Sequence, residues 1–289
     1  MAGIELYAPR LARHRRTWSV AAVVLAAVFL IGGPLIAVLI AKLTGLNSRM
    51  GWTSELYQLV VFFGLTAALL IAWVVLFERR PLSTIGFNQH GLKRFLRGYA
   101  IGLGFLLATI GLIWVAGGYR IESGGVFAKA GAVAALLPIG ALLLGFIVQG
   151  SAEEIVFRGW LMQLIASRHG LVIALIVNAV LFGTFIGLYA AREGSLWGVC
   201  GWHAAWNWLL GLGFGLEVSG HVIDVTPLFV DLTTTAGAPW WLTGATFGPE
   251  ASVVTTAILL GASVWVVLRG PFKGHATPEP VARAEAPAT

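Results

Sequence analysis

Charged residues are scarce in this 289-residue chain, and their scarcity excludes most classes of soluble protein. Only 11% of the residues are charged and 58% are hydrophobic, whereas a soluble domain carries about a quarter charged residues. So little charge leaves no polar coat for a surface that faces water. A water-soluble enzyme, a nucleic-acid-binding protein and a disordered protein are therefore excluded, and the composition indicates a protein of the lipid bilayer.

Cysteine is nearly absent, and basic residues are missing from one long segment. The single cysteine, Cys200, cannot form an internal disulfide, and it argues against a cysteine-rich metal site. Residues 193–268 contain no Lys or Arg but do contain Glu217, Asp224, Asp231 and Glu250. Because Lys and Arg remain on the cytoplasmic side of a membrane, we interpret the net charge of +6 as a record of orientation, not of nucleic-acid binding.

Apolar stretches long enough to cross a bilayer recur along the chain. A helix needs roughly 20 apolar residues to cross about 30 Å of hydrocarbon. We therefore expect an all-α fold, a polytopic transmembrane helical bundle with about seven apparent spans and no internal repeats. The expected spans are about Trp18–Ile40, Leu56–Phe77, Tyr99–Ala116, Ala130–Ala166, Leu171–Ala191, Leu196–Leu216 and Ala251–Leu268.

The charges divide the chain into three parts. Residues 1–17 hold four arginines and are expected to form a basic cytoplasmic N-terminus. Residues 18–268 form the transmembrane domain, with most polar motifs at 150–210, and the Pro/Ala-rich residues 269–289 are expected to be a disordered tail. We expect an integral protein of the bacterial cytoplasmic membrane with its N-terminus inside.

The number of spans disagrees with the charges. The acidic segment at about 217–250 should lie outside, whereas the N-terminus and the basic tail should both lie inside, which requires an even number of crossings. Three explanations stay open. The stretch at 130–166 crosses twice, one window contains two helices, or the weak charge of the tail misleads.

Ionisable groups within apolar helices indicate a functional site, because each costs several kcal/mol in a membrane unless it is paired or solvated. Glu153 and Glu154 are adjacent, and Arg158 follows Glu154 by four residues, so the two can form an ion pair on one helix face. His203 and Asn207 are also four apart and share a face. By contrast, we expect three further histidines to lie solvated in loops: His90, His169 and His221.

These residue types permit the activation of water. A buried Glu can take a proton from water and pass it to a leaving group. A His and an Asn can hold the water, a metal ion or a developing oxyanion. The alternative is a structural polar network that joins helices, in which Glu154 and Arg158 neutralise each other.

Two motifs resemble the CPBP family of intramembrane proteases, which includes the CAAX prenyl endopeptidases and bacteriocin-immunity proteins. The first motif, Glu-Glu-x-x-x-Arg, matches Glu153, Glu154 and Arg158, and the third, His-x-x-x-Asn, matches His203 and Asn207. The loop at 79–86 is also similar to the family, and the resemblance covers roughly residues 75–210. It implies a bundle of about eight spans.

The second motif, Phe-x-x-x-His, is incomplete. Phe182 begins it, but Ile186 occupies the position of the histidine. We therefore expect that about one span has been lost near 182–184, which fuses two helices of the family and inverts the direction of the helix that carries His203. Such an inversion would change the face that His203 presents, and catalysis tolerates a misplacement of only about 1 Å.

The resemblance implies a CPBP- or CAAX-type endopeptidase, metallo- or glutamate-dependent, that hydrolyses a membrane-associated or lipidated peptide. Glu154 would be the base, assisted by Glu153 and oriented by Arg158, while His203 and Asn207 would bind the water or oxyanion. A divalent metal such as zinc, held by Glu154 and His203, stays open as a cofactor. The alternative is a non-catalytic membrane partner, an immunity or scaffold protein on the same fold. The expected partners are the bilayer and a membrane-associated peptide or protein; nucleic acid is excluded.

Overall fold

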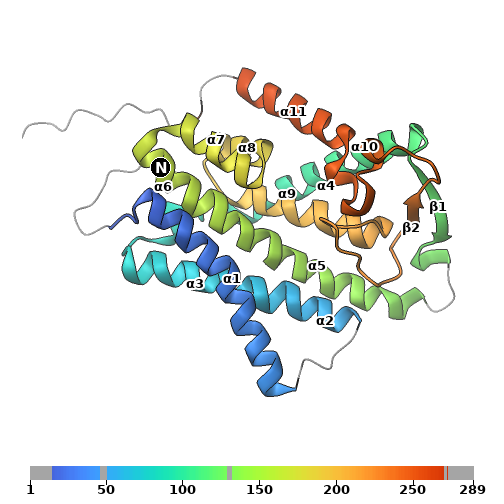
Figure 1. Ribbon diagram of the computed structural model, residues 1–289, viewed down its shortest axis with the longest axis horizontal. Coiled ribbons are helices and arrows are strands. Elements are labelled where there is room, and N and C mark those ends of the chain that lie inside the picture. The colour runs from blue at the N-terminus through green and yellow to red at the C-terminus, as the bar shows by residue number, and fades with distance from the viewer. Residues whose placement is uncertain (1–14, 46–50, 129–131, 270–271, 273–289) are drawn as a thin grey trace, which may run out of the picture.

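Long apolar helices dominate the computed structural model, which describes residues 15–45, 51–128, 132–269 and 272 (Figure 1). A backbone in lipid must satisfy its hydrogen bonds internally, so apolar segments become helical. The predicted all-α membrane fold is confirmed, whereas the predicted N-terminal segment 1–17 and tail 269–289 lie mostly outside the described residues. Among those described, four helices are long and apolar enough to cross a membrane: Ser19–Thr44 (α1), Trp52–Phe77, Gly91–Val115 (α4) and Ala134–His169.

Two of these long helices contain wider π-helical turns. The second long helix consists of α2 (Trp52–Tyr57), η3 (Gln58–Phe62), α3 (Phe63–Ala72) and η4 (Trp73–Phe77). The fourth consists of α5 (Ala132–Glu154), the π-helix η7 (Ile155–Leu161) and α6 (Met162–His169). Because this fourth helix is continuous, the stretch at 130–166 does not cross twice.

The expected span at Leu171–Ala191 is wrong, because the chain reverses within it. α7 (Leu171–Phe182) and α8 (Thr184–Glu193) meet at Gly183, whose φ of 113° and ψ of 148° suit glycine alone. A Cβ on Gly187 would lie 2.8 Å from the Asn178 side chain, although nine residues of straight helix measure about 13 Å. The two helices therefore fold back on each other as a short hairpin.

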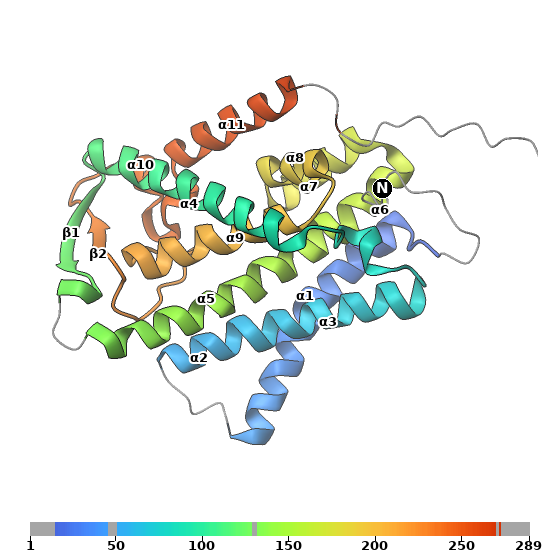
Figure 2. The same cartoon turned by 180° about the vertical axis from the view of Figure 1, so that it is seen from behind.

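The helix that carries His203 runs beside α4. α9 (Trp197–Trp208) continues into the π-helix η8 (Leu209–Gly213), and it lies parallel to α4, since Gly91 faces Trp197 and Gly102 faces Trp202 (Figure 2). The backbones touch at Gly98, where a Cβ would collide with the carbonyl group of Gly198. Small residues thus allow the two backbones to approach closely. Such packing holds helices together in a membrane, where the hydrophobic effect does not.

Both ends of the helical bundle lie on one side, which we call the basic end. The Arg168 guanidinium donates to the Arg16 carbonyl (2.9 Å), and Arg192 donates to the carbonyl of Arg269 (2.7 Å), directly after α11 (Val253–Leu268). The α7–α8 hairpin leaves this end and returns to it (Figure 1). The hypothesis of two fused helices, with an inverted His203 helix, is therefore wrong: α9 starts at the basic end and runs antiparallel to α5.

Glu78 and Arg80 form a buried ion pair at the basic end. Glu78 accepts from Arg80 (Nη2, 2.5 Å), from the Thr17 hydroxyl (2.6 Å) and from the Trp160 indole (3.1 Å). Burial lowers the pKa of Arg80 to about 10, so the guanidinium keeps its charge at neutral pH. Because Trp160 belongs to η7 and Thr17 lies just before α1, Glu78 connects the π-helix to the segment that leads into α1.

A small antiparallel sheet, not predicted from the sequence, marks the opposite end, which we call the strand end. β1 (Tyr119–Gly124) pairs with β2 (Val230–Thr234), with a bulge between Ile121 and Ser123. One short helix, α10 (Trp240–Thr243), lies near the sheet. The remaining single turns are 3-10 helices at Leu82–Ile85 (η5), Val126–Ala128 (η6), Ala245–Phe247 (η9) and Pro249–Ala251 (η10).

Candidate active site

The first motif lies where α5 widens into the π-helix η7. The Arg158 Nη1 donates to Glu154 Oε1 at 2.9 Å, as predicted for an i,i+4 ion pair, and both side chains are fully buried. Glu153 points to a neighbouring face and keeps 15% of its side chain exposed. π-helical turns are frequent at functional sites, and this one begins directly after two adjacent carboxylates that lie in different surroundings.

His203 on α9 lies between the two carboxylates. Its Nδ1 is 2.9 Å from Glu154 Oε1, the oxygen that also accepts from Arg158. Because an ionised carboxylate only accepts, Nδ1 carries a proton. In the neutral form of the ring, Nε2 is then the nitrogen that can accept. Nε2 lies 3.6 Å from Glu153 Oε2, too far for a direct hydrogen bond.

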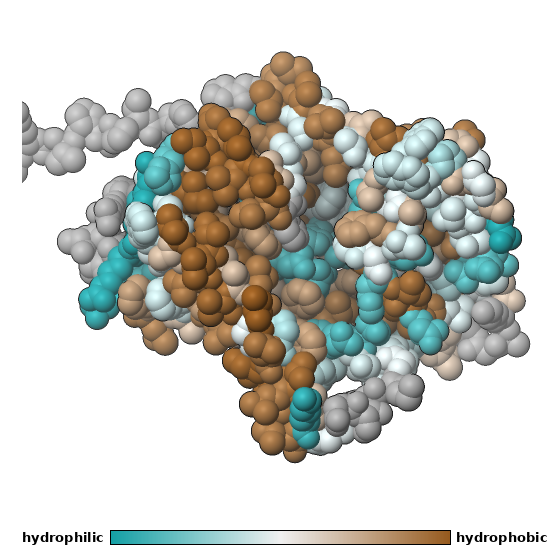
Figure 3. Space-filling view, viewed as in Figure 1, coloured by the Kyte–Doolittle hydropathy of each residue, from teal (hydrophilic) through white to brown (hydrophobic). Residues whose placement is uncertain are grey.

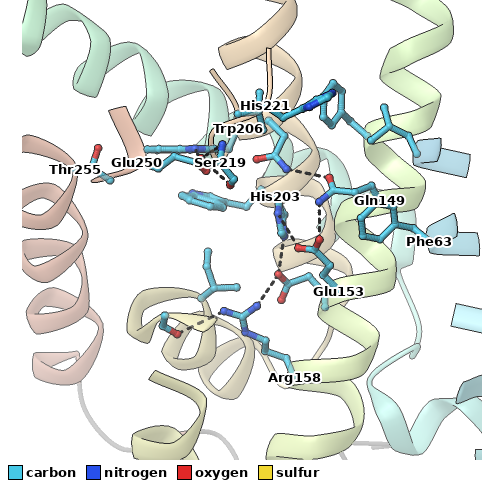
Figure 4. A pocket seen from close by; sticks show the side chains of 18 of the residues that line it. Phe63, Gln149, Glu153, Arg158, His203, Trp206, Ser219, His221, Glu250 and Thr255 are labelled. Atoms are coloured by element: carbon cyan, nitrogen blue, oxygen red, sulfur yellow. Dashed lines mark hydrogen bonds and ion pairs between the residues drawn. The ribbon is translucent and has the colours of Figure 1, made fainter. Parts of the chain in front are cut away.

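Gln149, which the sequence analysis did not single out, joins the two motifs on the other side. Its amide donates to Glu153 Oε1 (2.8 Å), and its carbonyl oxygen accepts from Asn207 Nδ2 (2.9 Å). Figure 4 shows Gln149, Glu153 and His203 converging from two helices. One turn of helix separates Gln149 from Glu153, so the i,i+4 spacing is the signal that could have identified it.

All five predicted site residues face one pocket of about 700 Å³ inside the bundle. Figure 3 shows a hollow on this face, with hydrophilic residues in its floor and a strongly hydrophobic flank on its left. α7 and α8 contain 12 and 10 residues, about 15–18 Å of helix, so the hairpin reaches only part of the way along the bundle. The apolar wall includes Leu59, Phe62, Phe63, Phe146, Phe185 and Leu259.

The tip of the hairpin places the incomplete second motif at this pocket. Ile186 lines the pocket with 8% of its surface exposed, so an aliphatic side chain stands where the family motif has its histidine. The carbonyl of Gly183 lies 3.5 Å from the Arg158 guanidinium. The site therefore brings together the first and third motifs and the backbone of the second, without the second histidine.

The pocket also reaches polar residues that the sequence analysis did not connect with it. Glu250 accepts from the backbone N–H and hydroxyl of Ser219 (2.5 and 2.8 Å) and from the Trp206 indole (3.2 Å). Burial raises the pKa of Glu250, opposed by the hydrogen bonds of Ser219. His221, expected to be solvated, is 58% exposed as predicted, but its Nε2 lies 2.9 Å from Glu55 Oε2 at the pocket.

The residues of the site do not fit a zinc ion. Among the described residues, no group of three His, Cys, Asp or Glu side chains is arranged to hold a metal, whereas zinc sites use at least three protein ligands. Glu154 Oε1 and His203 Nδ1 already bond to each other. The buried Arg158 beside Glu154 would also repel a cation.

Comparison with known proteins supports the motif-based resemblance. Residues 135–189 match the family model described as type II CAAX prenyl endopeptidase Rce1-like. The match covers α5, η7, α6 and most of the α7–α8 hairpin, including the first and second motifs, and it confirms the resemblance to CPBP and CAAX intramembrane proteases. The chain has no significant match among curated proteins or among solved structures.

Proposed function

We propose that this protein is an intramembrane peptidase that hydrolyses a membrane-associated or lipidated peptide with water activated by a glutamate. The observation that carries the proposal is the convergence of the Glu153–Glu154–Arg158 and His203–Asn207 motifs on one pocket between α5 and α9. The match to the CAAX endopeptidase model over 135–189 supports it.

Glu153 is the better general base of the two glutamates. Glu154 is fully buried, and one of its oxygens already accepts from both Arg158 and His203, so this carboxylate is already bound within the protein. No Lys or Arg in the described part of the chain lies at hydrogen-bond distance from Glu153, and this side chain keeps some exposure to the pocket. We therefore exchange the roles expected from the sequence: Glu153 takes the proton, and Glu154 orients His203.

The gap between Glu153 Oε2 and His203 Nε2 suits a water molecule. The two atoms are 3.6 Å apart, so one water can lie about 2.8 Å from both and donate a proton to each. A water held in this way presents a lone pair to the pocket. Glu154 fixes the ring through Nδ1, which keeps Nε2 an acceptor.

The reaction then needs only groups of this chain and its substrate. Glu153 removes a proton as the water oxygen bonds to the peptide carbonyl carbon, and the carbonyl oxygen becomes an oxyanion. One N–H of Asn207 is held by Gln149, and the second N–H can donate to this oxyanion. When the C–N bond breaks, Glu153 returns the proton to the leaving amine.

A second candidate is a non-catalytic membrane partner on the same scaffold. Ile186 favours it, because an aliphatic side chain lines the pocket at the position of the second-motif histidine. On this reading the buried ion pair and Gln149 only join α5 to α9. The substrate-sized pocket and the asymmetric surroundings of the two glutamates favour the peptidase.

The test compares the wild-type protein with E153Q in lipid nanodiscs, using membrane peptides with and without a lipidated C-terminus. Cleavage is followed by mass spectrometry, with E122Q on β1 as a control for charge. We expect cleavage by the wild type and by E122Q, and a loss of about 10²–10⁴-fold in E153Q, as for removal of a general base. Equal cleavage by E153Q would refute the mechanism. Full complementation of a deletion strain by E153Q would establish the non-catalytic partner instead.

A further inference from the structure

The half of the pocket toward the strand end holds a carboxylate that the proposed reaction does not use. Glu250 receives three hydrogen bonds, all from neutral donors: Ser219 N–H, Ser219 Oγ and Trp206 Nε1. Neutral donors orient a carboxylate but leave its charge in place. A partly buried charge of this kind favours a cation nearby.

No Lys or Arg among the described residues of the pocket lining supplies that cation at this end. Arg158 is the one Lys or Arg among the residues that line the pocket, and it is bound to Glu154. Glu55 lies at the same end and contacts His221. The segment 193–268, which builds most of this end, contains no Lys or Arg. The pocket therefore has negative charge at its strand-end half and apolar walls behind it.

An independent observation indicates a ligand with a hydrogen-bond acceptor. Trp202 lines the same pocket with 5% of its surface exposed, and its indole N–H has no acceptor among the described residues. A buried donor without an acceptor is unfavourable, because it has lost its hydrogen bond to water. The ring stacks on Trp206, with centroids 5.0 Å apart, so this donor stands beside the residue that binds Glu250.

The spacing along α9 relates these groups to the reacting residues. Trp206 follows His203 by three residues, about 4.5 Å along a helix, and it donates to Glu250 at 3.2 Å. Successive Cα atoms of a peptide are 3.8 Å apart. A peptide bond held at Glu153 and His203 would therefore bring the side chain of an adjacent residue toward Glu250 (Figure 4).

We propose that Glu250, with Glu55, binds a Lys or Arg side chain of the substrate peptide next to the cleaved bond, while the Trp202 indole donates to a backbone carbonyl of the same peptide. The inference rests on the proposed peptidase function, whose substrate class it narrows. Glu250 and Glu55 would decide specificity, and Trp202 would hold any peptide regardless of its side chain.

Binding can be measured without cleavage. The probes are two short, blocked, dansyl-labelled leucine peptides that differ at one central position, lysine in one and norleucine in the other. Their affinity for E153Q is measured by fluorescence anisotropy in nanodiscs of phosphatidylglycerol, which lack amine headgroups. We expect the lysine peptide to bind about 10–100-fold more tightly, as for a hydrogen bond to a charged group.

Three variants in the same background separate the contributions. E250Q should abolish the preference for lysine and E55Q should reduce it, whereas E122Q, matched in charge, should retain it. W202F should weaken both peptides by the same factor, about 2–10-fold. A measurement of thermal stability checks that each variant is folded. If E250Q does not fold, the lysine preference of E55Q is the test.

The outcomes distinguish this proposal from the proposed function. Retention of the lysine preference in both folded E250Q and E55Q would overturn the subsite, whether or not the wild type cleaves peptides. Loss of lysine-peptide binding on addition of phosphatidylethanolamine would assign the subsite to a lipid amine instead of a peptide. If the lysine peptide binds selectively but the wild-type protein cleaves no peptide, the subsite is supported and the peptidase function is refuted.

Discussion

Replacement of each adjacent glutamate by glutamine should damage this protein in a different way. Glu154 and Arg158 both have fully buried side chains, and their atoms lie 2.9 Å apart. In E154Q the guanidinium keeps its charge in the interior and loses its carboxylate. Breaking a buried pair in this way costs about 3–5 kcal/mol, a large part of the total stability of an ordinary domain.

E153Q should leave the fold nearly intact. Glu153 keeps 15% exposure and bonds to Gln149 through one oxygen, and the amide oxygen of a glutamine can still accept that bond. We expect a change in unfolding free energy below about 1 kcal/mol, the size of one neutral hydrogen bond. Peptidase activity should nevertheless fall about 10²–10⁴-fold, because an amide cannot take a proton from water.

Two measurements on purified variants in mixed micelles check this reasoning: unfolding by a denaturing detergent, and peptide cleavage by mass spectrometry. The expected pattern is loss of stability in E154Q and loss of activity with retained stability in E153Q. The double variant E154Q/R158L removes both charges and should recover part of the stability lost in E154Q. If E153Q proves to be the unstable variant and E154Q is stable but inactive, our assignment of the two roles is wrong.

Further predictions address the hairpin, the acidic pocket end and the incomplete motif. G183A should lower stability by about 1–3 kcal/mol, because the Gly183 backbone conformation is strained for other residues; G104A, with open space at the Cβ position, is the control and should lower stability by less than 1 kcal/mol or raise it. Because burial raises the Glu250 pKa, this carboxyl group favours the folded state below its ordinary pKa of about 4.3 and loses that contribution as pH rises through the raised value. E250Q should therefore flatten the fall in melting temperature between these two pKa values, and an unchanged slope there would contradict the prediction. I186H should add an imidazole to the pocket that holds Glu153 and His203 and allow Co²⁺ binding, detected by visible absorption; a spectrum identical to that of the wild type would show that the Ile186 side chain is not directed at the site.

Local spacing was sufficient to predict the core of the site. Two i,i+4 pairs, Glu154–Arg158 and His203–Asn207, follow from helical geometry alone, and both pairs face the pocket. Gln149 has the same spacing from Glu153 but is uncharged, so the cost of a charge in the membrane, the criterion that identified the others, did not select it. Glu250 and Glu55 join the pocket through tertiary packing of distant segments, and no local pattern indicates that.

Hydrophobicity predicted where most helices lie in the sequence, but not where the chain reverses within an apolar run. α1 lies close to its expected position because it is a single apolar run with polar flanks. α4 ends where expected but begins at Gly91, eight residues before the expected Tyr99, since hydropathy does not mark a helix that starts in a basic segment. Residues 171–191 form an equally apolar run, and hydropathy does not register a reversal that depends on one glycine at φ 113°. The β1–β2 pair was missed because its strands are short and more than 100 residues apart along the chain.

The hairpin also resolves the conflict between the number of spans and the charges. A single helix at 171–191 would give seven crossings and place the two ends of the bundle on opposite sides. Because the chain turns at Gly183 and returns to the basic end, this segment adds no net crossing, and Arg16 and Arg269 both lie at the basic end. α9 then runs antiparallel to α5, so that Asn207 meets Gln149 while His203 meets Glu154. Along α5 Gln149 precedes Glu154, whereas along α9 Asn207 follows His203. Reversal of α9 would therefore break both contacts. The geometry of the candidate site therefore depends on the turn at Gly183, which belongs to neither the first nor the third motif.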